Sequence, residues 1–181
     1  VGWLRRTLTA SDLARVWAIS WLGNLLGALL LAGIFVAGGG GVLLGDGAPL
    51  LYKVAGAKMN GPGGELFARA ILCNWLVCLA LWMAARTASD AAKLGVIFWC
   101  LFAFIASGYE HSVANMTLFS IALLGEHPDT VSLAGMARNL AWVSLGNVVG
   151  GSVFMAAGYW FISKPALAPA VQGAQVPSEL R

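Results

Sequence analysis

The stretch Ser107-Gly108-Tyr109-Glu110-His111-Ser112-Val113-Ala114-Asn115-Met116 places polar side chains inside an apolar part of the chain. Residues 94–106 before it are apolar apart from one glycine, and residues 117–125 after it are mostly apolar. A carboxylate, an imidazole, an amide and hydroxyls are costly in such surroundings unless they bind one another or face a cavity. We therefore expect this polar decapeptide to hold the groups on which function depends.

The composition of the whole chain indicates a polytopic membrane protein. Of its 181 residues, 59% are hydrophobic and 10% are charged, whereas a soluble domain has about 25% charged residues. The net charge of +3 is small and the basic residues form no dense patch, which argues against nucleic acid as a partner. Cys73, Cys78 and Cys100 lie in apolar segments without histidine at metal-ligand spacing, so we interpret them as buried thiols. No metal or cofactor is predicted.

Apolar segments predict four crossings of a bilayer, at about residues 16–37, 65–85, 94–124 and 139–161. The first is uncharged and long enough for a hydrocarbon core of about 30 Å. The third is too long for one simple span of roughly 20 residues, so we expect a helix that is broken at the polar decapeptide. Ser107-x-x-Glu110 has the spacing of a capping box that would start the second half-helix, unless this spacing arises by chance.

The segments outside these spans set the predicted orientation. Thr9-Ala10-Ser11-Asp12 has the composition of a helix start. Residues 38–64 are predicted to form a glycine-rich loop, and residues 163–181 a disordered cytoplasmic tail. Basic residues concentrate in the N-terminal segment, the turn at 86–93 and the tail, so the positive-inside rule places both termini in the cytoplasm.

A short motif occurs twice in the chain. Leu22-Gly23-Asn24-Leu25-Leu26-Gly27 in the first predicted span matches Leu145-Gly146-Asn147-Val148-Val149-Gly150 in the last one. The paired glycines have the spacing that lets helix backbones approach closely. Because the two spans are predicted to run in opposite directions, the match favours an inverted repeat over a chance similarity. If the halves are equivalent, two further helices, one of them broken, are expected before the first span.

Two segments carry a resemblance to a known family. Cys73-Asn74-Trp75-Leu76-Val77-Cys78-Leu79-Ala80 and residues 106–116 resemble signature segments of the formate/nitrite transporter family, and the repeated motif also fits. Trp82-Met83-Ala84 and Gly158-Tyr159-Trp160 are closest to its nitrite-channel branch. The resemblance implies an all-α, aquaporin-like helical bundle with an inverted repeat, of which residues 1–162 form a partial channel domain with four of six spans. It also implies homopentamers, with one pore per protomer, in the inner membrane of a bacterial cell.

His111 is the central candidate for function. An imidazole can offer a proton or a positive charge to a small monovalent anion, and it titrates near neutrality. The resemblance places His111 in the middle of the family's pore, between two hydrophobic constrictions. The alternative is a core histidine that is bonded to the neighbouring backbone.

Polar residues near His111 or in the repeat are the next candidates. Glu110 does not share a helical face with its neighbour, so we expect it to cap the half-helix or to orient another polar group. Asn74, near the middle of the second span, is expected to bind His111 or the permeant ion, or else to make an interhelical hydrogen bond. Asn24 and Asn147 are pore candidates of the same kind as Asn74, and the alternative is that one or both satisfy backbone groups that a helix break leaves free.

Three further candidates follow from their positions relative to these residues. Phe104 precedes His111 by about two helical turns, and Val77 is one turn after Asn74. The resemblance assigns apolar residues at these places to pore constrictions, and ordinary lipid-facing or core side chains are the alternative. Lys58 matches a family lysine at the outer vestibule, where it would attract anions, and the alternative is a solvated loop lysine.

Together these features predict a membrane channel or transporter for nitrite or formate, in which His111 stabilises or protonates the anion. One alternative is a channel for neutral solutes on the same scaffold, which proton-independent, uncharged flux would reveal. Another is a non-conducting, truncated membrane subunit, because the two helices expected before the first span are missing from this sequence. No enzyme is expected, because the chain has two histidines, His111 and His127, and no nucleophile–base pair or metal cluster accompanies them.

Overall fold

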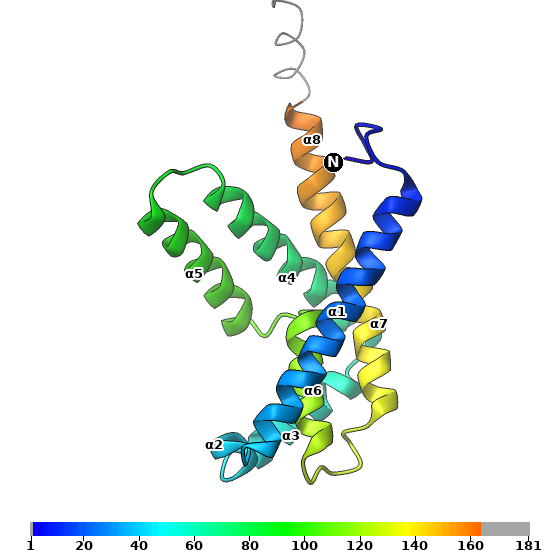
Figure 1. Cartoon of the computed structure of the whole chain (residues 1–181), viewed down its shortest axis with the longest axis vertical. Coiled ribbons are helices and arrows are strands. Elements are labelled where there is room, and N and C mark those ends of the chain that lie inside the picture. Colours follow the sequence, from blue (N-terminus) through cyan, green and yellow to red (C-terminus); the bar gives the residue numbers. More distant parts are fainter. Residues whose placement is uncertain (1, 164–181) are drawn as a thin grey trace, which may run out of the picture.

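The computed structural model describes residues 2–163, and these residues are helical over most of their length (Figure 1). The predicted tail lies outside the described residues from residue 164 onward. In chain order, the elements are α1 (Ala10–Ala37), α2 (Gly41–Leu44), α3 (Ala48–Asn60), α4 (Gly63–Ala84), α5 (Asp90–Ala106), α6 (Ser112–Leu124), α7 (Leu133–Val149), the π-helical segment η1 (Gly150–Ala157) and α8 (Gly158–Ser163).

Helix α1 begins where the sequence predicts a helix start. The Thr9 hydroxyl accepts a hydrogen bond from the Asp12 amide at 3.1 Å, and the Asp12 carboxylate accepts one from the Thr9 amide at 3.0 Å. This reciprocal pair is a capping box, which satisfies amides that the first helical turn leaves free. The helix therefore starts before the apolar span that it contains.

The predicted helix break is confirmed, and it lies between α5 and α6. Gly108 has a φ of +65°, a left-handed conformation that favours glycine. Its amide donates to the Ile105 carbonyl at 3.1 Å, and the Tyr109 amide donates to the Phe104 carbonyl at 3.0 Å. These two bonds form a Schellman motif, in which Ser107 is the C-cap residue of α5.

The predicted capping box at the break is wrong. Ser107 ends α5, and the N-cap of α6 is His111. The left-handed Gly108 reverses the chain directly after Ser107, so the backbone regains helical geometry only after His111.

The predicted loop at residues 38–64 is also wrong over much of its length, because it contains α2 and α3. In α3, Leu51, Ala55 and Met59 recur at intervals of one helical turn, and all three are buried. Pro49 lies in the first turn, where its missing amide costs no hydrogen bond. Helix α3 packs against α6 and α7, which bury its apolar stripe.

The repeated motif packs closely in only one of its two copies among the described residues. In α7, a Cβ atom at Gly146 would lie 2.6 Å from Cβ of Ala70 and would also clash with the Phe67 carbonyl of α4. In α1, Gly23 and Gly27 have no heavy atom within 4 Å of a built Cβ atom. Gly146 therefore allows the close approach of α7 to α4, whereas Gly23 and Gly27 of α1 lie in no such close helix contact.

The two copies give opposite predictions for alanine. We expect Gly146→Ala to lower the free energy of unfolding by about 1–3 kcal/mol, because its methyl group must displace the α4 backbone. Gly23→Ala is the matched control, and we expect it to raise stability by about 0.5–1 kcal/mol, as in an open helix interior. Thermal unfolding in detergent measures both changes. Equal midpoints for the two variants would contradict the assigned α4–α7 contact.

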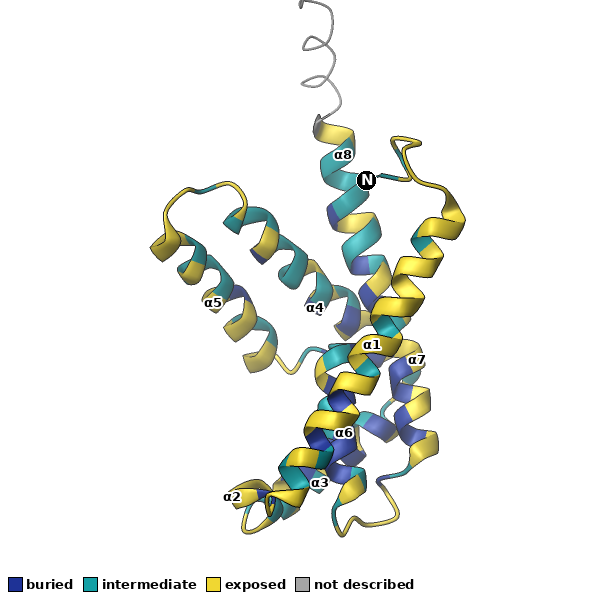
Figure 2. Cartoon of the chain, in the orientation of Figure 1, coloured by how far each residue is buried: buried dark blue, intermediate teal, exposed yellow. Residues whose placement is uncertain are grey.

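Within the described residues, three helices are long and apolar enough to cross a membrane, namely Ala10–Ala37, Gly63–Ala84 and Leu133–Ile162. They contain or overlap the first, second and last predicted spans. The third predicted crossing is divided between α5, with 17 residues, and α6, with 13. Many residues of α1 and α5 are exposed (Figure 2), and they include apolar side chains such as Leu30 and Phe102. The chain is thus an all-α membrane protein with a broken helix.

Candidate functional site

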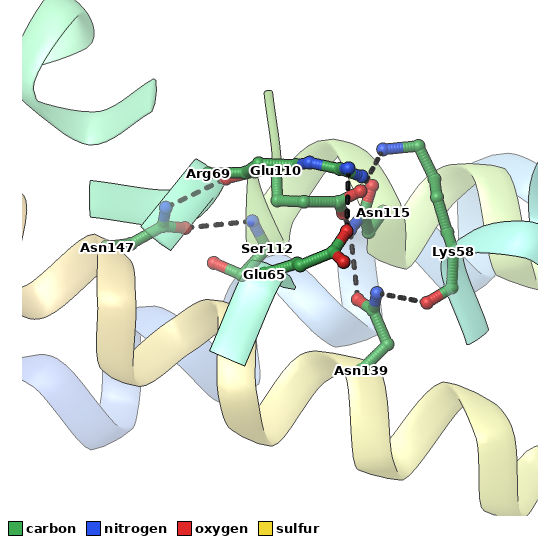
Figure 3. Close-up of polar contacts among 8 residues, drawn as sticks. All are labelled: Lys58, Glu65, Arg69, Glu110, Ser112, Asn115, Asn139 and Asn147. Atoms are coloured by element: carbon green, nitrogen blue, oxygen red, sulfur yellow. Dashed lines mark hydrogen bonds and ion pairs between the residues drawn. The ribbon is translucent and has the colours of Figure 1, made fainter. Parts of the chain in front are cut away.

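Asn147 of α7 fixes the two sides of the helix break. Its Oδ1 atom accepts from the Ser112 amide at 2.9 Å, while its Nδ2 atom donates to the Glu110 carbonyl at 3.0 Å (Figure 3). The same Nδ2 atom donates to the Ala70 carbonyl of α4 at 2.9 Å. One buried amide therefore satisfies donors and acceptors that the break leaves free, which is the alternative given above for Asn147.

Asn24 and Asn74 have different partners. Asn24 Nδ2 donates to the Ser20 carbonyl of its own helix at 2.8 Å and contacts no break among residues 2–163. Asn74 Nδ2 donates to the Asn147 carbonyl at 2.6 Å, which is the interhelical bond given above as its alternative. The bond joins α4 to α7 beside the break, so Asn74 and Asn147 form one unit.

Glu110, whose side chain is 2% exposed, is a member of a closed ring of polar contacts. Its Oε1 atom pairs with Lys58 Nζ at 2.8 Å, and its Oε2 atom accepts from Asn115 Nδ2 at 2.6 Å (Figure 3). Asn115 Nδ2 also donates to Asn139 Oδ1 at 2.9 Å, and Asn139 Nδ2 donates to the Lys58 carbonyl at 2.8 Å. The ring joins α3, α6 and α7, and within the described part of the chain no buried side-chain polar atom lacks a partner.

The contacts of this ring distinguish between the alternative roles given above for Glu110 and for Lys58. Glu110 does not cap α6 and instead orients Lys58 and Asn115. Lys58 is not a solvated loop lysine, because it lies on α3 with a side chain only 20% exposed. Glu110 lies at contact distance and compensates the positive charge of Lys58. An anion therefore experiences the field of the ion pair and not that of a free lysine.

Breaking this ion pair from one side is expected to be costly. Lys58→Met leaves the buried Glu110 carboxylate without its cation and should lower the free energy of unfolding by about 3–5 kcal/mol. Adding Glu110→Gln removes the stranded charge and should recover most of that loss. Arg69→Met is the matched control, because it breaks the exposed Arg69–Glu65 pair, worth about 0.5 kcal/mol. Thermal unfolding gives the comparison, and a double variant as unstable as Lys58→Met would contradict it.

His111 lies at the start of α6 and is half-buried. Its Nδ1 atom accepts from the Ala114 amide at 3.4 Å, so a neutral imidazole there carries its proton on Nε2. The Phe104 ring stacks on the imidazole with centroids 6.0 Å apart and an interplanar angle of 27°. A continuous helix does not align the two residues, because α5 ends between them, and the folded break brings them together instead.

A cavity of about 770 Å³ gathers four of the predicted residues, namely Asn24, Asn74, His111 and Asn147. Tryptophan side chains of the N-terminal segment and α1 and small residues of η1 form other parts of its wall. No Asp, Glu, Lys or Arg is among its lining residues in the described part of the chain. The cavity is thus lined by apolar groups, amides, serine hydroxyls, one thiol and one imidazole.

The other four predicted residues lie outside this lining. Phe104 contacts it through the His111 ring, and Val77 is half-buried on α4, one position before the lining residue Cys78. Glu110 and Lys58 belong to the polar ring behind the break. The structure therefore separates the predicted set into cavity residues and supporting residues.

Several functional contacts were not predicted. Asn115 and Asn139 complete the ring around Glu110, and each is an amide in an apolar helix, the same signal that singles out Asn74. Trp21 Nε1 donates to Ser144 Oγ at 2.9 Å and joins α1 to α7 at the cavity wall. Neither residue of this last pair has a sequence pattern that distinguishes it from other span residues.

The fold and the site are those of a helical membrane protein in which an asparagine holds a broken helix beside a cavity without Asp, Glu, Lys or Arg among its described lining residues. The sequence profile of the family described as formate/nitrite transporter matches residues 1–161. This chain belongs to that family, which confirms the resemblance noted in the sequence.

Individual relatives agree with this assignment. The chain is 51% identical to the nitrite transporter NirC of Escherichia coli strain K12 over 158 residues, which are 86% of this chain and 58% of that protein. It is 35% identical to a probable formate transporter of Methanothermobacter thermautotrophicus, covering 89% of this chain and 63% of the relative. The chain thus spans about 58% of the length of NirC.

Two solved structures share the fold. One is an FNT family ion channel with a TM-score of 0.84 and 48% identity, over 89% of this chain and 64% of that one. The other is a pentameric formate channel with formate bound, with a TM-score of 0.72 and 30% identity, over 84% and 67% of the two chains. The helical arrangement described above is therefore that of the family.

Proposed function

We propose that this chain forms the pathway of a channel or transporter for small monovalent anions, nitrite or formate. The observation that carries the proposal is the cavity beside the helix break, whose walls hold His111 and amides but no carboxylate among the described residues. A nitrite transporter and a formate channel with formate bound are among its relatives. An anion in such a cavity meets hydrogen-bond donors without meeting negative charge.

His111 is the proposed centre of this pathway. It precedes α6, whose N-terminus carries a partial positive charge from the aligned peptide dipoles. An anion that reaches the imidazole is stabilised by its Nε2–H group, or takes a proton and continues as the neutral acid. The second version predicts that transport rises as the external pH falls through the titration range of the imidazole.

Supporting roles are proposed for the remaining candidates. Asn74 and Asn24 offer amide groups along the wall, and Asn147 holds the break in place. Phe104 and Val77 narrow the pathway and exclude strongly hydrated ions, while the Lys58–Glu110 pair biases the electrostatic potential at the vestibule. Asn24, Asn74 and Asn147 line the cavity, whereas Phe104 contacts it through the His111 ring and Val77 precedes the lining residue Cys78.

The proposed setting is the inner membrane of a bacterial cell. Residues 1–162 form the partial channel domain in the lipid bilayer, both ends of the chain are cytoplasmic, and the protein assembles as a homopentamer. Exposed apolar side chains of α5, including Phe98, Phe102 and Ile105, suit contact with lipid or with a second protomer. The structural neighbour with bound formate is itself pentameric.

Uptake of nitrite and formate into proteoliposomes tests the proposal. The chain is compared with a version extended by the two further helices that the repeated motif predicts, under imposed pH gradients and membrane potentials. Saturable anion uptake in either version is the expected result, and its dependence on the proton gradient separates the two roles of His111. Flux of water or ammonia without anion flux would replace the proposal with a neutral-solute channel. Absence of all flux in both versions would favour a non-conducting subunit.

A further inference from the structure

A second cavity, of about 300 Å³, adjoins the one that holds His111. The two cavities share the lining residues Cys78, Gly151 and Ala156, so they are neighbours along α4 and η1. Arg5 of the N-terminal segment also lines the second cavity, together with aromatic side chains of α4 and α8. This end of the molecule, where the N-terminal segment lies near α8, is far from α3 (Figure 1), the helix that carries Lys58.

Arg5 is the cationic residue of this second cavity, and no described residue neutralises it. The ion pairs within residues 2–163 are Lys58–Glu110, Arg69–Glu65 and Lys93–Asp90. No Asp or Glu is among the described lining residues of either cavity. The nearby Arg86 guanidinium lies over the Trp82 ring, 4.5 Å from its centroid, and is held there by a cation–π contact.

The walls around Arg5 strengthen the effect of its charge. Trp82 and Tyr159 stack with ring centroids 4.1 Å apart and an interplanar angle of 29°, and both line the cavity. A cleft with charge of one sign and walls of low dielectric concentrates the electric field and raises the local concentration of counter-ions. The planar guanidinium also matches the two oxygen atoms of a carboxylate or nitrite.

We infer that the Arg5 cavity is a binding site for a small monovalent oxyanion, from which the anion passes into the cavity that holds His111. The inference rests on the proposed function and deepens it, because it names a residue that collects the substrate at the end opposite Lys58. Arg5 acts by attraction and orientation, and the proton chemistry belongs to His111.

Cys78 offers a direct measure of this charge that needs no transport, because it lines both cavities. In detergent, its rates of modification by an anionic and a cationic methanethiosulfonate are followed by mass spectrometry of the peptide that contains it. We expect Arg5→Gln to lower the ratio of the anionic to the cationic rate by about tenfold, as loss of one nearby charge predicts. Arg6→Gln is the matched control, since Arg6 is exposed like Arg5 but lines neither cavity, and it should leave the ratio unchanged.

Nitrite uptake in proteoliposomes supplies the second measurement. Arg5→Gln should raise the concentration that half-saturates uptake by about fivefold at low salt and weaken its dependence on ionic strength. Arg5→Lys should restore most of the rate ratio at Cys78, which separates loss of charge from misfolding. Equal rate ratios for Arg5→Gln and Arg6→Gln would overturn the inference. If neither the parent chain nor its extended version conducts an anion, the proposed function fails, while the Cys78 rates still decide the role of Arg5.

Discussion

Replacing His111 with alanine is expected to reduce nitrite or formate uptake by at least about tenfold and to abolish its dependence on pH. A hydrogen bond to a charged group contributes about 1.5–3 kcal/mol, so its loss along the proposed pathway lowers the rate by about tenfold or more. The uptake assay in proteoliposomes, repeated between pH 5 and pH 8, measures both effects.

The pH dependence has a definite sign under this mechanism. An imidazole that gives its proton to the anion is replenished more readily as the external pH falls, so uptake by the parent chain rises toward acid pH. His111 and Cys78 are the titratable side chains that line the main cavity within residues 2–163. Removing the imidazole should therefore leave uptake that hardly changes with pH in this range.

His127 provides the matched control for this substitution. It lies in the exposed loop before α7, and its Nδ1 atom is 3.3 Å from the Pro128 carbonyl. His127→Ala should conduct like the parent chain at every pH. Parental flux and parental pH dependence in His111→Ala would exclude His111 from the pathway, whatever the behaviour of His127→Ala.

The broken helix was predictable because its signals are local. An overlong apolar segment, a polar decapeptide and Gly108 are all visible within one stretch of sequence. The partners of the decapeptide are not local, since Glu110 binds Lys58 from 52 positions earlier. Sequence patterns showed that Glu110 needs a partner, and only the fold shows which one it has.

Helix α3 illustrates a different limit of sequence reasoning. Its apolar residues have helical spacing, but they are few, and flanking glycines make the whole region resemble a loop. Burial by α6 and α7 stabilises this helix, and tertiary packing of this kind overrides weak local propensity. The position of Lys58 could be predicted only together with this packing.

The repeated motif shows how identical sequence acquires different roles. Asn24 and Asn147 occupy the same place in the motif, yet Asn24 bonds within its own helix and Asn147 bonds across a helix break. The difference lies in their surroundings, because Asn147 is buried between α4 and the start of α6, while Asn24 is exposed to the cavity. The pair therefore allows one substitution to be compared in two environments.

Asn147→Leu is expected to lower the free energy of unfolding by about 4 kcal/mol. The change leaves the Ser112 amide and the carbonyls of Glu110 and Ala70 without their partner in a buried place. Each unsatisfied group of this kind costs about 1–3 kcal/mol. Asn24→Leu loses a single bond to the Ser20 carbonyl and should change stability by less than about 0.5 kcal/mol.

Hydrogen exchange at one amide distinguishes this explanation from a general packing defect. In the parent chain the Ser112 amide donates to Asn147 Oδ1, so it should exchange slowly. In Asn147→Leu it should exchange much faster, whereas amides in the middle of α1 should change only as far as global stability changes. Asn24→Leu should leave the Ser112 amide protected. If that amide stays protected in Asn147→Leu, the break is held by other contacts, and the site does not depend on this asparagine.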